Sequence, residues 1–204
     1  MSVVPPNEVA VERSLLDNPA VLRTIGVIGF PIFIGIAAQV SFPLPPWDLP
    51  FSLQSLAVVL SALCLGRKYG SLALLIYIAA GAIGFPVFSQ GRDGLEVVLG
   101  QTGGYILGFL IAQPVIVGFI RRSDGSIRGW GAMITAVLAG HGVIFLIGLP
   151  WLYFWRLWFA EQPPTIWLTF RNGMLAFIPG MIIKAAIAVW LGRLAAPLAS
   201  KKIW

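Results

Sequence analysis

The chain has 204 residues, of which 58% are apolar and only 11% are charged, with a mean hydropathy of +0.87 and a formal net charge of +6. Soluble domains carry roughly 25% charged residues, so this chain cannot cover a water-facing surface with charge. The composition therefore excludes a soluble globular domain and predicts one all-α integral membrane domain, whose basic residues concern orientation in the bilayer rather than nucleic-acid binding.

Six apolar runs are long enough, or nearly so, to cross a bilayer. A helix rises about 1.5 Å per residue, and about 20 residues cover a hydrocarbon core about 30 Å thick. The predicted spans are, in chain order, 21–42, 51–66, 70–88, 103–120, 130–152 and 172–196. The second is short, so we expect it to be tilted or buried against its neighbours. This divides the chain into a segment 1–20, a six-helix domain 21–198 and a tail 199–204.

The positions of Lys and Arg predict the orientation, because cytoplasmic loops of membrane proteins are enriched in them. With the N-terminus inside, three of the 14 basic residues fall outside, Lys184 lies within a span, and the rest are cytoplasmic. The cytoplasmic ones are Arg13, Arg23, Arg67, Lys68, Arg121, Arg122, Arg128, Arg193, Lys201 and Lys202. We therefore expect both termini, and the tail that follows the last span, on the cytoplasmic side.

Small residues recur at every fourth position in three stretches: Gly100-Gly104-Gly108, Ala132-Ala136-Gly140 and Ala188-Gly192-Ala196. Such a stripe lets a neighbouring helix approach closely. We expect the stripes to pack helices of this bundle against one another. Docking onto a membrane partner is the alternative.

The sequence lacks the residues that would power transport or catalyse a reaction. None of the eight Asp and Glu residues falls inside a predicted span, whereas ion-coupled carriers often use an intramembrane carboxylate. The phosphate-binding loop of ATPases and the H-E-x-x-H and G-x-S-x-G motifs of hydrolases are also missing. These absences predict a binding protein or conduit that is not an enzyme, holds no metal or cofactor, and depends on another protein for energy.

Lys184 is the one formal charge buried deep in a predicted span, since Arg23 and Arg193 lie close to the ends of theirs. Such a lysine costs about 2.5–3.5 kcal/mol on insertion scales, and the spans contain no acidic partner. We expect a ligand carboxylate to supply the missing anion; a lysine that reaches one membrane surface or binds carbonyl groups is the alternative. Gln54 is either a helix-to-helix contact or a ligand contact, and His141 is expected to be neutral and bonded across the bundle.

The segment 88–105 is glycine-rich and moderately apolar, and it leads into a helix through Thr102-Gly103-Gly104-Tyr105. Glycines allow sharp bends and close approach of the backbone to a ligand. Irregular backbone at membrane depth normally lines a cavity. We therefore expect this segment to cover an outward-facing pocket; a simple surface turn is the alternative.

Several longer motifs occur in a characteristic order along residues 20–198. They are Phe51-Ser-Leu-Gln-Ser-Leu, Leu65-Gly-Arg-Lys-Tyr-Gly70, Gly81-Ala-Ile-Gly-Phe-Pro-Val-Phe88, Leu99-Gly-Gln-Thr-Gly-Gly-Tyr-Ile-Leu-Gly-Phe109, Gly148-Leu-Pro-Trp-Leu152 and Phe177-Ile-Pro-Gly-Met-Ile-Ile-Lys184. With these motifs the chain resembles the BioY family, the biotin-binding S components of energy-coupling factor (ECF) transporters.

The resemblance implies a six-helix, multi-pass protein of a prokaryotic plasma membrane that binds biotin from outside and contains no ATPase. Its expected partners are a transmembrane coupling subunit and ABC-type ATPases. The lysine after Pro-Gly lines the pocket in the family, and the loop before Thr-Gly-Gly-Tyr, here 89–102, covers it. The substrate-binding residues expected here are Lys184, Arg92, Gln54, Gly103, Gly104, Tyr105, Met181 and Asn172.

Two positions depart from the family pattern. Met181 stands where the family usually has Asp, a partner for the polar ureido ring, and Arg92 stands where the loop commonly carries Asn. A buried ureido N–H without a partner would cost roughly 1–3 kcal/mol, so another group such as Gln54 or Asn172 is expected to compensate. The alternatives are an S component for another small carboxylated vitamin or cofactor, such as a lipoate-like molecule, and a non-transport membrane protein.

Overall fold

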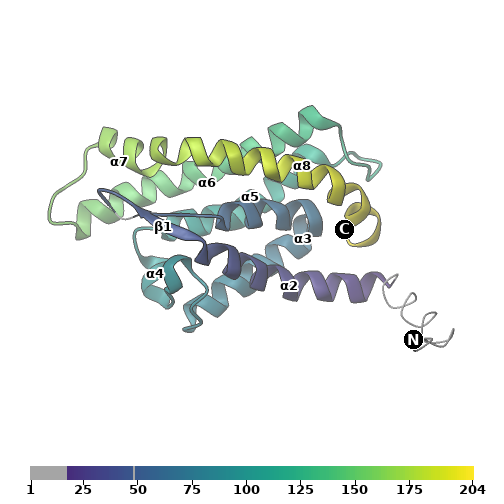
Figure 1. The fold of residues 1–204 in the computed structure, drawn as a ribbon, viewed down its shortest axis with the longest axis horizontal. Helices are drawn as coiled ribbons and strands as arrows, with labels where there is room; N and C mark the ends of the chain where they lie inside the picture. The colour runs from purple at the N-terminus through teal and green to yellow at the C-terminus, as the bar shows by residue number, and fades with distance from the viewer. Residues whose placement is uncertain (1–17, 48) are drawn as a thin grey trace, which may run out of the picture.

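The computed structural model describes residues 18–47 and 49–204, and helices that run side by side account for most of it (Figure 1). In chain order the elements are α2 (Pro19–Gln39), β1 (Ser41–Leu44), β2 (Leu49–Ser52), α3 (Gln54–Ala82), η1 (Ser89–Gly91), α4 (Leu95–Leu99), α5 (Gly103–Ile120), α6 (Trp130–Phe159), α7 (Ile166–Gly173), η2 (Leu175–Phe177) and α8 (Ile178–Lys202). The expected all-α class is confirmed, while most of the predicted segment 1–20 lies outside the described residues.

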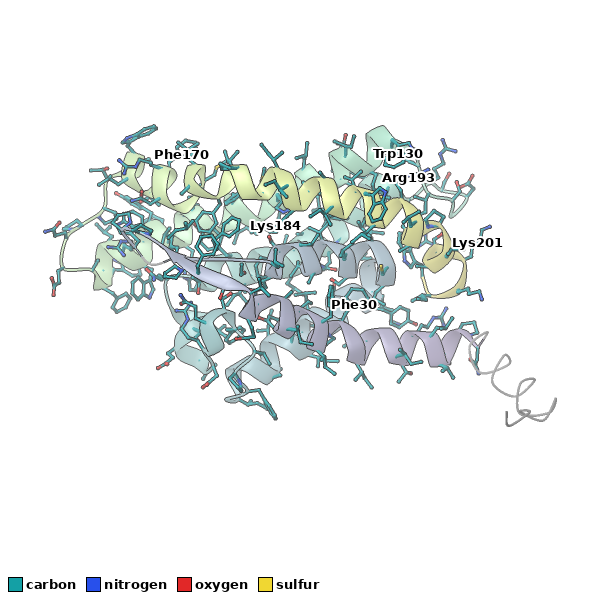
Figure 2. The ribbon with its side chains drawn as sticks, in the orientation of Figure 1. Phe30, Trp130, Phe170, Lys184, Arg193 and Lys201 are labelled. Atoms are coloured by element: carbon teal, nitrogen blue, oxygen red, sulfur yellow. The ribbon has the colours of Figure 1, made fainter. Side chains whose placement is uncertain are left out.

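Large apolar side chains cover the outside of the bundle (Figure 2). On α2, the side chains of Ile25, Ile28, Ile32 and Ile36 are 56% to 63% exposed. A surface this apolar is typical of helices whose solvent is lipid. Among the described residues, five segments are long and apolar enough to cross a membrane: Pro19–Gln39, Gln54–Ala82, Gly103–Ile120, Trp130–Phe159 and Ile166–Lys202.

One of these five segments, α3, is two helices joined at Gly66. The backbone of Gly66 has φ 72° and ψ −175°, a conformation that is open almost only to glycine. The Gln54 side chain donates a hydrogen bond to the Tyr77 hydroxyl at 2.9 Å, although a straight helix would separate these residues by about 34 Å. The chain therefore turns back at Gly66, and the two predicted runs 51–66 and 70–88 correspond to the two arms of α3, although the second arm ends at Ala82 rather than at 88.

The proline-rich connection after α2 forms a two-stranded antiparallel hairpin, which the sequence did not predict. Phe42 pairs with Phe51 and Pro43 with Pro50. Proline cannot donate a backbone hydrogen bond, but it is tolerated in strands that have a free edge. The predicted span 21–42 therefore ends at Gln39, and the predicted span 51–66 begins as a helix only at Gln54.

The last two predicted spans also differ in their bounds. The α6 helix continues beyond the predicted end at residue 152 to Phe159. The last long helix, α8, begins at Ile178 rather than 172, with Pro179 in its first turn, where a missing N–H costs nothing. It runs on to Lys202, so most of the predicted tail 199–204 is helical. The α5 helix, Gly103–Ile120, has the predicted bounds.

The stripes of small residues pack helices of the bundle against each other, as expected. A Cβ atom added to Gly108 of α5 would lie 2.8 Å from the Ile144 Cα atom of α6. One added to Gly140 would lie 2.6 Å from Ile116. One added to Gly192 of α8 would lie 2.6 Å from Leu63 of α3. Glycine is required at Gly108, where the neighbour is backbone, whereas at Gly140 and Gly192 the neighbouring Ile116 and Leu63 side chains would have to shift.

Candidate functional site

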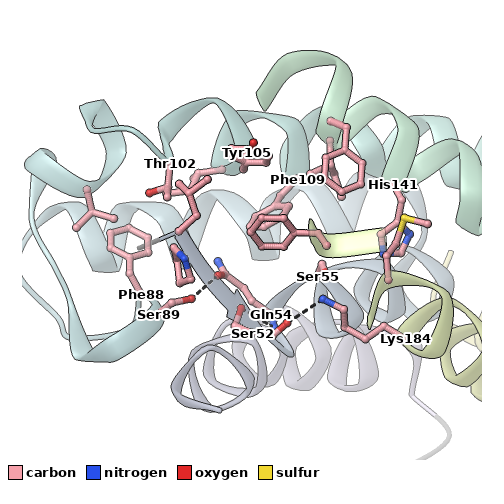
Figure 3. A pocket seen from close by; sticks show the side chains of 18 of the residues that line it. Ser52, Gln54, Ser55, Phe88, Ser89, Thr102, Tyr105, Phe109, His141 and Lys184 are labelled. Carbon is pink, nitrogen blue, oxygen red and sulfur yellow. Dashed lines mark hydrogen bonds between the residues drawn. The ribbon is translucent and has the colours of Figure 1, made fainter. Parts of the chain in front are cut away.

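A pocket of about 770 Å³, partly open to the surface, lies between the β1–β2 hairpin, the 89–102 loop and helices α3, α5, α6 and α8 (Figure 3). Its walls are largely apolar and include Phe88, Val97, Ile106, Phe109, Ile144, Phe145, Phe177 and Met181. The polar groups that line it come from Ser52, Gln54, Ser55, Ser89, Arg92, Thr102, Tyr105, His141 and Lys184.

Lys184 is buried in this pocket, with 6% of its surface exposed. Its Nζ atom donates a hydrogen bond to the Ser52 carbonyl oxygen at 3.0 Å and lies 4.4 Å from the centre of the Phe51 ring. None of the described residues that line the pocket is acidic. The carbonyl bond uses one of the three ammonium donors, so Lys184 is a buried cation that still lacks an anionic partner.

Gln54 joins α3 to the start of the 89–102 loop. Its amide nitrogen donates to the Tyr77 hydroxyl, and its oxygen accepts a hydrogen bond from the Ser89 hydroxyl at 3.1 Å. The Tyr77 hydroxyl in turn donates to the Val87 carbonyl oxygen at 3.0 Å. Both ends of the Gln54 amide are therefore engaged within the protein, although the side chain also lines the pocket.

Gln39, which the sequence did not single out, also holds the 89–102 loop. Its Nε2 atom donates to the Phe88 carbonyl oxygen at 3.1 Å, and its Oε1 atom accepts from the Gly91 N–H at 2.9 Å. Within the loop, Arg92 lines the pocket and its Nε atom donates to the Ser89 carbonyl oxygen at 3.2 Å. Partial burial lowers the pKa of the Arg92 guanidinium and nearby Glu96 raises it, and the group is charged at neutral pH.

One ring nitrogen of His141, Nε2, has no hydrogen-bond partner in the part of the chain that the structure describes. Its ring is 3% exposed, and Nδ1 lies 2.9 Å from the Val137 carbonyl oxygen, one turn back in the same helix. Because a carbonyl can only accept, Nδ1 carries the hydrogen, and in the neutral ring Nε2 is an acceptor. Nε2 has no hydrogen-bond partner among the described residues. The prediction that His141 forms a hydrogen bond across the bundle is therefore wrong. The side chain instead lines the pocket with an unpaired Nε2 atom.

The structure brings five of the eight expected binding residues to the pocket: Lys184, Arg92, Gln54, Tyr105 and Met181. It does not bring Gly103, Gly104 or Asn172 there. An added Cβ atom would collide with the Val98 carbonyl oxygen at Gly103 and with the Trp151 side chain of α6 at Gly104. Asn172 is buried on α7, and its Nδ2 atom has no partner. The Tyr105 hydroxyl donates to the Gly173 carbonyl oxygen at 2.8 Å, which links α5 to α7.

Comparison with known proteins shows which family has this architecture. Residues 12–201 match the model of the BioY family. The chain belongs to the BioY family. It is 39% identical over 120 residues to the biotin transporter BioY of Thermotoga maritima, covering 59% of this chain and 68% of the relative. It is 39% identical over 160 residues to the probable biotin transporter BioY of Pyrococcus horikoshii, covering 78% of this chain and 87% of the relative.

The fold agrees with this membership. A solved structure of the S-component for biotin from an ECF-type ABC transporter superposes with a TM-score of 0.72 and 26% identity, covering 94% of this chain and 93% of that one. The BioY family consists of transporter S components rather than enzymes, which confirms the prediction that this chain is not an enzyme. Two residues of this pocket, Met181 and Arg92, are those noted above as departures from the family pattern.

Proposed function

We propose that this chain is the membrane-embedded binding subunit for biotin uptake, energised by a coupling subunit and ABC-type ATPases. The observation that carries the proposal is the buried ammonium group of Lys184, which has no anionic partner among the described residues that line this largely apolar pocket. A carboxylated ligand would provide that anion. The BioY relatives and the S-component structure support biotin as that ligand.

The chemistry of the pocket suits the parts of biotin. The carboxylate needs a cation, and Lys184 and Arg92 both line the pocket. The sulfur ring and the aliphatic chain need apolar walls, which Phe109, Ile144 and Phe177 help to form. The ureido group needs both donors and acceptors, which the serine hydroxyls and His141 offer.

We further propose six membrane crossings, with both termini in the cytoplasm of a prokaryotic cell. The start of α2 and the end of α8 lie at the same end of the bundle, which an even number of crossings requires (Figure 1). One cavity at that end is lined by Arg23, Arg67 and Arg121. Because cytoplasmic loops are enriched in basic residues, this end of the bundle is expected to face the cytoplasm. The candidate pocket lies toward the other end and so faces outward.

Binding to detergent-purified protein tests the proposed ligand. We expect biotin to raise the midpoint of thermal unfolding in a saturable way, and lipoate at the same concentration to have a smaller effect. Absence of any shift at millimolar biotin would contradict the biotin assignment. The Met181→Asp variant forms a second arm, since it adds a carboxylate three residues before Lys184. Tighter biotin binding by this variant would indicate that the native site has a relaxed affinity or another substrate.

Replacing His141 with phenylalanine should weaken biotin binding about tenfold. The substitution keeps an aromatic ring of similar size but removes the Nε2 acceptor, and an unpaired buried donor on the ligand costs roughly 1–3 kcal/mol. Isothermal titration of the purified variants measures the change. His141→Asn, which retains an acceptor oxygen, is the matched control and should lose less affinity than His141→Phe. Equal affinities for wild type and His141→Phe would remove His141 from the site.

A further inference from the structure

A second cavity lies at the opposite end of α5 from the candidate pocket, where α2 begins and α8 ends. It has a volume of about 1170 Å³ and is open to the surface. We call it the basic cavity, after the five cationic residues that line it: Arg23 of α2, Arg67 and Lys68 at the bend of α3, and Arg121 and Arg122 after α5. The α5 residues that line the two cavities come nearest at Phe109 and Val117, which lie about 12 Å apart along the helix axis.

The five cations of the basic cavity lie together without an Asp or Glu among the described residues that line it. None of the described residues that line the basic cavity is Asp or Glu, and within the described part of the chain none of the five cations forms an ion pair. Asp124 follows closely in sequence, but it does not line the cavity and accepts hydrogen bonds from the Ser126 N–H and hydroxyl. Like charges gathered in this way repel one another, so a bound anion would stabilise the arrangement.

Aromatic rings and backbone carbonyls hold two of the cations in place. The Arg23 guanidinium lies 5.3 Å from the centre of the Tyr69 ring, and that of Arg121 lies 5.7 Å from the centre of the Trp204 ring. The Arg23 Nε atom also donates to the Ile203 carbonyl oxygen at 2.8 Å, and the Trp204 indole N–H donates to the Cys64 carbonyl oxygen at 3.2 Å. These contacts position the charges without a ligand, which lowers the cost of binding one.

The surroundings of the basic cavity favour a lipid over a soluble anion. Beyond Arg23, the α2 helix presents the half-exposed side chains of Ile25, Ile28 and Ile32, a surface suited to acyl chains. Basic pockets at the cytoplasmic ends of membrane helices are suited to anionic headgroups. We propose that the basic cavity binds the phosphate of an anionic phospholipid in the leaflet on this side of the membrane. This site is separate from the biotin pocket and does not depend on the proposed ligand.

Native mass spectrometry of the full chain in detergent tests the site with phosphatidylglycerol and with phosphatidylcholine at equal concentration. The cavity variant R67Q/R122Q removes two cations whose guanidinium groups form no hydrogen bond or ring contact with the described residues. The control variant R128Q/K201Q removes two exposed cations at the same end that do not line the cavity. We expect wild type to retain phosphatidylglycerol preferentially. The cavity variant should bind phosphatidylglycerol roughly thirtyfold more weakly, because each basic residue near an anionic headgroup contributes a factor of about five to the affinity.

The control variant should keep the wild-type affinity within about threefold. An equal loss in both variants would mean that overall charge attracts the lipid, and the site would be rejected. No preference of wild type for phosphatidylglycerol over phosphatidylcholine would also reject it, whether or not the variants fold. If inorganic phosphate displaces phosphatidylglycerol at similar concentration, the ligand is a soluble anion and the lipid assignment is wrong. A midpoint of thermal unfolding equal to that of wild type, measured without ligand, would show that both variants keep the bundle intact.

Discussion

Replacing Lys184 with methionine should lower the affinity for biotin by about thirtyfold or more. Removing one partner of a buried charge pair costs about 2 kcal/mol or more, because the other partner is left buried without compensation. The same change should not reduce the stability of the ligand-free protein, since it removes a charge that is expensive to bury in a span. Isothermal titration and thermal unfolding in detergent measure the two effects separately.

Biotinamide, in which an uncharged amide replaces the carboxylate, shows which part of the ligand Lys184 contacts. If the ammonium group pairs with the carboxylate, wild type should bind biotinamide more weakly than biotin, and Lys184→Met should bind both about equally. A similar loss for both ligands would place Lys184 against another part of biotin. Lys201→Met, at an exposed lysine on the last turn of α8, is the matched control and should bind biotin as wild type does. Unchanged biotin affinity in Lys184→Met would contradict the proposed role.

Replacing Gly66 with alanine should destabilise the protein by about 3 kcal/mol and lower its unfolding midpoint by roughly 10 °C. The backbone conformation at this residue, φ 72° and ψ −175°, is strained for any residue with a side chain. An added Cβ atom would also lie 2.8 Å from the Trp204 ring. Since the two arms of α3 meet at this residue, we expect biotin binding to weaken together with stability.

Two further variants separate backbone strain from the collision. Gly29→Ala adds a methyl group where no atom lies within 4 Å, in the middle of a helix, so its stability should be unchanged or slightly higher. The double variant Gly66→Ala/Trp204→Ala removes the collision but keeps the strained backbone, and it should remain less stable than Trp204→Ala alone. Wild-type stability in Gly66→Ala would show that the bend tolerates other conformations.

Local properties of the sequence were sufficient to predict where the chain becomes helical. Hydropathy depends only on neighbouring residues, so the runs were found, and α5 had the predicted bounds. The same reasoning could not give the strands of the hairpin, because the pairing of Phe42 with Phe51 is a contact between separate segments. It placed the start of α8 too early because the apolar composition continues through α7 and η2, where the backbone changes conformation.

At the candidate site, too, local sequence predicted one part and contacts between distant segments decided the rest. The sequence by itself determined that Lys184 is a charge in an apolar span, since no carboxylate lies in any predicted span. Only the tertiary structure decided what surrounds it: the carbonyl of Ser52, 132 residues earlier in the chain, and a pocket that His141 on another helix also lines. Hydrogen-bond partners so far apart leave no periodic signal in a sequence. For that reason composition and charge order identified a membrane protein with a buried cation, and the folded chain alone showed which groups line the pocket around that cation.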